Sequence, residues 1–231
     1  MRKIGLIGGM SWLSTQTYYE HINKQVQARA GARASAPMVI ESLDFSEMAR
    51  LSTKEEWDRA AKTLAASARR LEKAGATAVL IGANSMHKVY DAVAAAVDVP
   101  VIHIAECVAD RMAANRVKKA ALIGTRNVMV ESFYRQKLIA RDIELLPPEM
   151  AFVDRLDRII YDELLLGKAS RQAERELKTI MTNLAQDGAE AVVLGCTELE
   201  MIVTVDANVL PIYDCTRIHA QAAVDWIMGE G

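Results

Sequence analysis

Residues 75–84 read GATAVLIGAN, and residues 188–197 read GAEAVVLGCT. Each stretch contains a short apolar run that ends at a glycine, a pattern typical of a strand in a parallel sheet covered on both faces. The two stretches therefore predict equivalent buried strands. They place Ala83 just beyond the first strand and Cys196 just beyond the second.

Two further blocks repeat in the same order along the chain. Residues 3–8, KIGLIG, recur as residues 119–124, KAALIG. Residues 99–102, VPVI, recur as residues 210–213, LPIY. Similarity in three ordered blocks indicates two copies of one structural unit.

Helical segments alternate with these strands. Thr53 and Glu56 have capping-box spacing and begin an amphipathic segment that ends at Gly75. Its counterpart begins after Ser170 and ends before Gly188. This alternation predicts an α/β fold of two similar doubly wound parallel-sheet domains, both Rossmann-like.

The repeat also predicts where the domains and the site lie. We expect a first domain over residues 1–98 and a second over residues 99–211, with residues 212–231 returning to the first. A pseudo-twofold axis between like domains would bring Ala83 and Cys196 face to face across an interdomain cleft. Ligands of such sheets bind beyond the carboxyl ends of the strands, where both residues are expected.

The composition favours a small-molecule partner. The net charge is only -2 in 231 residues, so no strong field attracts nucleic acid or an anionic membrane. No apolar run is long enough to span a bilayer, and the N-terminal apolar stretch is too short and glycine-broken for a secretory segment. We therefore expect a soluble cytoplasmic protein. Three cysteines form an odd set without paired spacing, which argues against a disulfide framework or a Cys-rich metal site.

Polar groups follow the two equivalent strands. A thiol at the turn after residue 195 would meet backbone N–H groups and a helix N-terminus, which lower a thiol pKa and suit a base or nucleophile. The alternative for Cys196 is a buried structural cysteine. In the first copy, Asn84 and Ser85 can bind a carboxylate or cap a helix.

Glycine turns follow the first strand of each copy. Residues 8–11 read GGMS and residues 124–127 read GTRN, and such turns let the backbone approach an anionic ligand or are simply tight turns. The order G-x-G-x-x-G is absent, which argues against a dinucleotide site.

The remaining thiols and imidazoles favour structural roles. Cys107 and Cys215 lie several residues past the proline-containing strands and are expected in the core or on helix faces. His87 and His103 are near enough to the strand ends to reach a cleft, and His219 lies in an amphipathic terminal helix, but structural roles are more common for all three. No His, Asp and Glu set has metal-ligand spacing, so we expect no metal.

Four stretches together resemble the aspartate/glutamate racemase family across nearly the full chain. They are residues 1–15 with their GGMSW motif, NSMH at 84–87, GT at 124–125 and GCTE at 195–198. The sequence is most similar to bacterial members described as broad-specificity amino-acid racemases. This resemblance implies an amino-acid or dicarboxylate substrate, no cofactor, and a homodimer.

The resemblance also implies a site. Two facing acid/base residues, at positions 83 and 196, would work on opposite faces of the substrate Cα, while hydrogen-bond donors stabilise the enolate-like state of its carboxylate. The expected substrate-binding residues, which include the first glycine turn, are Gly9, Met10, Ser11, Asn84, Ser85, Thr125 and Thr197.

This chain departs from the family pattern at the first acid/base position. Ala83 stands where the family has cysteine or, in some bacterial relatives, threonine, and alanine can neither take nor give a proton. It is either an engineered substitution or a native change that leaves a one-base enzyme with Cys196 as the surviving acid/base.

A second departure concerns the side-chain pocket. The basic residues with which archaeal aspartate racemases hold the distal carboxylate fall on Met48 and Leu165. Arg50, Arg126 and Lys168 are candidate substitutes, but a neutral or broadly tolerated side chain is an equal expectation.

Three functions remain open. The first is a racemase or epimerase that interconverts L- and D-amino acids without pyridoxal phosphate. The second is a single-cysteine decarboxylase or isomerase of a dicarboxylate, and the third is a non-catalytic amino-acid-binding relative. Solvent exchange at Cα, carbon dioxide release, and binding without exchange distinguish them.

Overall fold

The computed structural model describes residues 1–203 and 208–230. The chain forms two compact units, one of residues 1–103 and 219–231 and the other of residues 104–218. Residues 204–207 and 231, which fall within the expected domains, lie outside the described residues.

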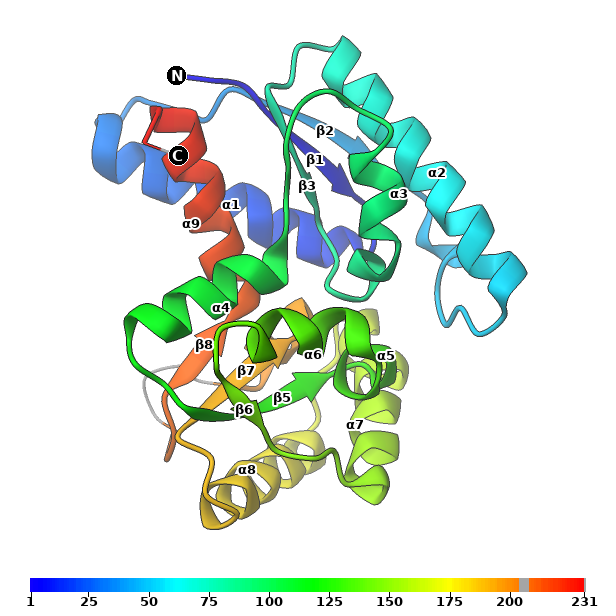
Figure 1. The fold of residues 1–231 in the computed structure, drawn as a ribbon, viewed down its shortest axis with the longest axis vertical. Coiled ribbons are helices and arrows are strands. Elements are labelled where there is room, and N and C mark those ends of the chain that lie inside the picture. Colours follow the sequence, from blue (N-terminus) through cyan, green and yellow to red (C-terminus); the bar gives the residue numbers. More distant parts are fainter. Residues whose placement is uncertain (204–207, 231) are drawn as a thin grey trace. The chain divides into compact units, whose positions relative to one another are not determined.

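The first unit is built around a four-stranded parallel sheet (Figure 1). Its elements, with 3-10 helices marked η, are β1 (Ile4–Gly8), α1 (Trp12–Ala30), β2 (Met38–Ser42), η1 (Phe45–Glu47), α2 (Lys54–Lys73), β3 (Ala78–Ile81), η2 (Ser85–Val89), α3 (Tyr90–Ala94) and β4 (Val101–Ile102). The strand order is β2-β1-β3-β4, and every pairing is parallel.

The second unit repeats this plan. Its elements are α4 (Ile104–Ala114), β5 (Lys119–Gly124), α5 (Arg126–Val130), α6 (Ser132–Ile139), β6 (Glu144–Leu145), α7 (Met150–Asp162), η3 (Leu164–Leu166), α8 (Arg171–Gln186), β7 (Ala191–Gly195), η4 (Thr197–Met201), β8 (Ile212–Asp214) and α9 (Cys215–Met228), the last of which continues into the first unit. The order β6-β5-β7-β8 matches that of the first sheet, which confirms the duplication that the sequence blocks predicted.

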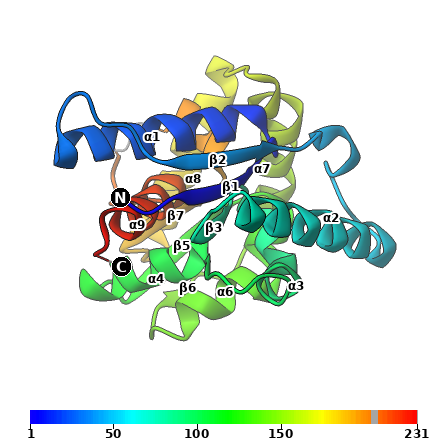
Figure 2. The ribbon, with the colours of Figure 1, turned by 90° about the horizontal axis from the view of Figure 1, so that it is seen from above.

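Helices cover both faces of each sheet, as a doubly wound fold requires. In the first unit, α1 and the end of α9 pack on one face, and α2 and α3 pack on the other (Figures 1 and 2). In the second unit, α7 and α8 cover one face, and α4 and α6 cover the other. The predicted α/β class is therefore confirmed.

The helix ends follow the local signals in the sequence. The Thr53 hydroxyl accepts from the Glu56 N–H at 3.2 Å, and the Glu56 carboxylate accepts from the Thr53 N–H at 2.9 Å, which completes the capping box of α2. Ser170 caps α8 in the same unit as Cys196, by accepting from the Ala173 N–H at 3.1 Å.

The units divide at different residues from those expected. Because β4 pairs with β3, residues 99–103 belong to the first unit. Because β8 pairs with β7, residues 212–218 belong to the second, and the return to the first unit starts at His219.

Candidate active site

Because the strands within each sheet are parallel, the turns that follow neighbouring strands of that sheet lie side by side. Gly124 at the end of β5 is the register partner of Gly195 at the end of β7. Neighbouring strands lie about 4.8 Å apart, so Thr125 and Cys196 follow as adjacent residues at the carboxyl edge of the sheet. A Cβ on Gly124 would come within 2.7 Å of the Gly195 carbonyl oxygen, so a side chain there would force the two strand ends apart.

Cys196 is buried at the turn between β7 and η4. Its thiol donates to Glu198 Oε2 at 3.1 Å. Burial, and then the negative charge of Glu198, raise the pKa of the Cys196 thiol well above its ordinary value. The thiol therefore carries its proton near neutral pH and donates it in a hydrogen bond to the Glu198 side chain.

This direction is opposite to the one expected from the sequence. The backbone N–H groups of Glu198 and Leu199 do approach the sulfur and lower its pKa, as a turn of this kind should. Their effect on the pKa is smaller than that of burial, which removes the thiolate from water. The sequence contains Glu198 two residues after Cys196, but it does not reveal which way the carboxylate points.

Two threonines line the same turns. Thr125 is buried, and its hydroxyl oxygen has no hydrogen-bond partner among the described residues. Thr197 is also buried, and its hydroxyl accepts from Thr216 at 3.2 Å. An unpaired buried hydroxyl costs free energy, so Thr125 is suited to donate to a ligand.

The equivalent turn of the first unit carries Ala83, Asn84 and Ser85. Ala83 is buried directly after β3 and Gly82. Asn84 is buried too, makes no capping hydrogen bond to η2, and leaves its Oδ1 without a partner within the described part of the chain. Of the two roles considered for Asn84, helix capping is therefore absent from the structure.

The first glycine turn lies beside Ala83, because β1 pairs with β3. Met10 packs in the same core cluster as Ala83. The Gly9 N–H donates to the Thr15 hydroxyl at 2.7 Å, and Ser11 caps α1. This turn thus holds itself together through its own hydrogen bonds.

The three histidines considered for chemistry are buried in the first unit. His87 Nδ1 donates to the Ala83 carbonyl oxygen at 3.0 Å, and the ring of His87 lies 4.8 Å from that of His103 and 5.8 Å from that of His219. Burial and the neighbouring His87 lower the pKa of His219 to about 3. His219 is therefore neutral, and His87 braces the turn that carries Ala83.

The other two thiols have structural surroundings. Cys215 is fully buried at the start of α9, 2.8 Å from the Tyr134 hydroxyl, and burial raises its pKa. Cys107 is half-buried on α4.

An acidic pair that the sequence did not single out lies near the Cys196 turn. Asp214, at the end of β8, is buried beside Glu200 of η4. Burial, and then Glu200, raise the pKa of Asp214 to about 7, although Arg217 opposes the shift. No periodic pattern marks this contact, because it joins the end of β8 to a residue of η4.

The side-chain pocket residues considered from the sequence are largely apolar or engaged. Met48 is buried in the first unit, and Leu165 is partly buried against the core cluster that contains Cys196. Arg126 forms an ion pair with Asp154 on α7.

No group of three or more His, Cys, Asp or Glu residues within residues 1–203 and 208–230 is arranged to hold a metal ion. No helix in the same ranges is long and apolar enough to cross a membrane.

The fold and the turns at the strand ends together define a class of protein with two similar parallel sheets and a buried thiol directly after one strand. Residues 7–223 match the Asp/Glu/hydantoin racemase family model, and the chain belongs to this family. The sequence is 22% identical over 231 residues to the broad specificity amino-acid racemase RacX of Bacillus subtilis, covering 96% of each chain.

Solved structures agree with this assignment. A candidate Asp/Glu racemase from Yersinia pestis has 38% identity and a TM-score of 0.90, covering 99% of this chain and 100% of that chain. An aspartate racemase homologue from Pyrococcus horikoshii has 30% identity and a TM-score of 0.85, with the same coverage of 99% and 100%.

Proposed function

We propose that this protein acts on amino acids without a cofactor, and that Cys196 transfers the Cα proton from one face of the substrate only. The observation that carries the proposal is the buried Cys196 thiol, which donates to the Glu198 carboxylate at 3.1 Å. Ala83 occupies the equivalent turn of the first unit and has no group that can take or give a proton.

The proposed reaction begins when Glu198 accepts the thiol proton. The resulting thiolate removes the α-proton, an S–H bond forms, and the electron pair of the broken C–H bond moves into an enediolate on the substrate carboxylate. Thr125 would donate to that carboxylate, and Asn84 Oδ1 would accept from the substrate ammonium. Their unpaired buried atoms support these roles.

With one thiol, the proton returns to the face from which it left. If the S–H proton exchanges with solvent before it returns, the product carries a solvent proton and keeps its configuration. Net inversion would require a donor on the opposite face, where the proposed arrangement has Ala83. The expected activity is therefore α-proton exchange with little racemisation.

We propose a substrate with a neutral or broadly tolerated side chain. Met48 is buried and Leu165 partly buried, and Arg126 is already paired with Asp154. The other two basic candidates, Arg50 and Lys168, have exposed side chains. The Bacillus subtilis relative is a broad specificity amino-acid racemase, which supports this choice. We also propose that the protein is a homodimer in the cytoplasm, as expected from the sequence.

The single thiol also favours a second candidate, decarboxylation of a substituted malonate. There the bond between Cα and one carboxyl carbon breaks, carbon dioxide leaves, and the Cys196 thiol gives its proton to the enediolate. An isomerase of the family type normally uses a second cysteine, so it fits Ala83 less well. Carbon dioxide release from a malonate would identify the decarboxylase.

The test is incubation of single-enantiomer amino acids in deuterated water with the wild-type protein and two variants. Cys196→Ser should lower α-deuterium incorporation by about a thousandfold, because a hydroxyl is a far weaker base. Cys107→Ser, a change of another thiol in the same unit, should leave it unchanged. Equal exchange by Cys196→Ser and the wild type would overturn the proposal. Measurable binding without any exchange by the wild type would indicate a non-catalytic binding protein.

A further inference from the structure

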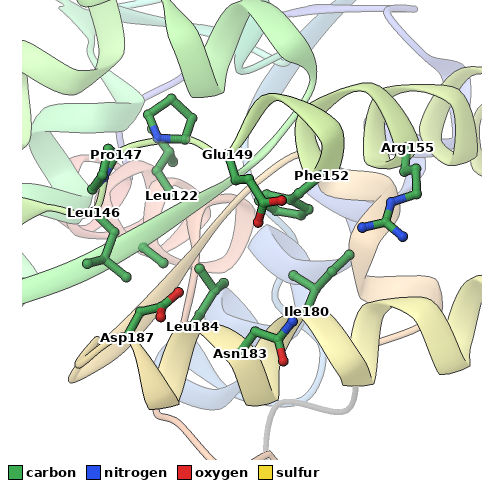
Figure 3. Close-up of a pocket in the computed structure, with 12 residues that line it drawn as sticks. Leu122, Leu146, Pro147, Glu149, Phe152, Arg155, Ile180, Asn183, Leu184 and Asp187 are labelled. Atoms are coloured by element: carbon green, nitrogen blue, oxygen red, sulfur yellow. The ribbon is translucent and has the colours of Figure 1, made fainter.

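The second unit contains a cavity that the proposed chemistry does not use. It has a volume of about 200 Å³ and lies between α7 and α8, over the sheet (Figure 3). A cavity of about 150 Å³ is enough to hold benzene, so this space admits a ring or a branched aliphatic group.

The floor of the cavity is apolar. It is formed by side chains from β5, the segment after β6, α7 and α8, namely Ala121, Leu122, Leu146, Phe152, Ile180 and Leu184. Apolar surface of this kind binds the apolar body of a ligand by removing both from water.

The rim carries charged and polar groups. Glu149 and Arg155 project from the α7 side, and Asn183 and Asp187 lie along α8 on the other side (Figure 3). Within the described residues, none of these four side chains has a hydrogen-bond or ion-pair partner. Two carboxylates, one guanidinium and one amide thus surround an apolar space without neutralising one another.

The cavity lies near the amino-terminal ends of the strands, whereas Cys196 follows the carboxyl end of β7. Asp187 precedes β7, and Cys196 follows it. A five-residue strand spans about 16 Å at about 3.3 Å per residue. Ala121, which lines the cavity, pairs with Val192 near the start of β7. A molecule bound here would therefore not reach the thiol.

We propose that this cavity is a second binding site, and that it takes a free amino acid with an apolar side chain. Its side chain would fill the apolar floor, its carboxylate would bind Arg155, and its ammonium would bind Glu149 and Asp187. The rim charges complement a zwitterion better than a simple cation or anion, because each end of the zwitterion finds an opposite charge. This site does not depend on the proposed Cα chemistry.

Phenylalanine is the probe for the test. A molecule of its size with a typical ligand efficiency binds with a Kd of about 1 mM. Titration of the isotope-labelled protein to about 10 mM phenylalanine, followed by amide chemical shifts, should move signals from Phe152, Asn183 and Leu184 with one common Kd. The same shifts should persist in Cys196→Ser, as expected for a site that does not use the thiol.

Matched variants and ligands test the charges. Arg155→Gln should weaken phenylalanine binding about fivefold, as loss of one solvent-exposed ion pair does, whereas Arg158→Gln on the same helix should not. Phenethylamine lacks the carboxylate and 3-phenylpropionate lacks the ammonium, so both should bind more weakly than phenylalanine. Three results would overturn the proposal: no shifts around the cavity, equal binding by Arg155→Gln, or equal binding of all three ligands.

Discussion

At the scale of single residues, the Cys196 and Glu198 pair sets the protonation state of the candidate site. Glu198 raises the thiol pKa in two ways, through its charge and through the hydrogen bond that it accepts from the protonated thiol. The effect of the charge vanishes if the carboxylate becomes a neutral amide, although the amide oxygen can still accept the thiol hydrogen bond. Glu198 is therefore the residue through which the thiol pKa can be tuned.

Glu198→Gln is predicted to lower the pKa of Cys196. The rate of Cys196 alkylation by iodoacetamide, followed by peptide mass spectrometry across a pH series, should then reach its midpoint at lower pH than in the wild type. Glu174→Gln, a change at a half-buried position on α8, should leave the midpoint in place. A midpoint that stays or rises in Glu198→Gln would contradict the assigned role.

The position of Cys196 could be predicted from the sequence because the repeat itself marks the strand end. Its pKa could not, since the result depends on burial and on the direction of a neighbouring side chain. The contact between Asp214 and Glu200 could not be predicted for a related reason, because it joins the end of β8 to η4.

At the scale of elements, local signals were sufficient wherever a few adjacent residues determine the structure. Thr53 and Glu56 form the predicted capping box, and Gly75, with φ of +87°, follows the end of α2. The buried face of α2 includes Trp57, Ala60 and Leu64, whereas Ala61 is only half-buried.

Thr53→Ala is predicted to reduce the free energy of unfolding by about 1 kcal/mol, because the Glu56 N–H loses its acceptor. Chemical denaturation measures this loss. Thr53→Ser keeps the hydroxyl and should retain most of the stability. Equal destabilisation by alanine and serine would show that the methyl group, not the cap, is responsible.

His219 on α9 makes the first unit sensitive to acid. His219 lies between the Tyr18 hydroxyl, at 2.7 Å, and the Ile102 carbonyl oxygen, at 2.9 Å. The carbonyl can only accept, so Nε2 carries the proton and Nδ1 accepts from tyrosine. Burial then lowers the pKa of His219 from 6.5 to about 3.

The lowered pKa of His219 determines how the free energy of unfolding changes with pH. Below pH 6.5 the unfolded chain binds a proton at His219 that the folded protein does not bind until about pH 3. The His219 contribution is therefore complete above pH 6.5 and is lost as the pH falls toward 3, by about 1.4 kcal/mol per pH unit.

Denaturation at about pH 7 and about pH 5 should consequently show a smaller loss of stability in His219→Gln than in the wild type. His21→Gln, at a half-buried position on α1, keeps His219 and should show the wild-type loss. The same pH dependence in all three proteins would exclude His219 as its source.

At the scale of the whole molecule, the duplication could be predicted from the sequence because both copies contain the same strands and glycine turns. The two sheets share one strand order, and Ile7 pairs with Ile81 as Ile123 pairs with Leu194. Ala83 and Cys196 therefore occupy equivalent places in their own units.

The domain boundary was harder to predict, because no change in composition marks it. Each proline-containing block pairs with the strand before it, so residues 99–102 and 212–214 belong to the sheets that precede them. Pairing of this kind is long-range and leaves no local signature in the sequence.

The central claim is that a single thiol acts from one face. The most direct measurement is α-deuterium incorporation into the separate L- and D-enantiomers of one accepted amino acid in deuterated water, read together with inversion. We predict exchange into one enantiomer with little inversion, and a gain of racemisation in Ala83→Cys. Incorporation into both enantiomers at similar rates by the wild-type protein would contradict it.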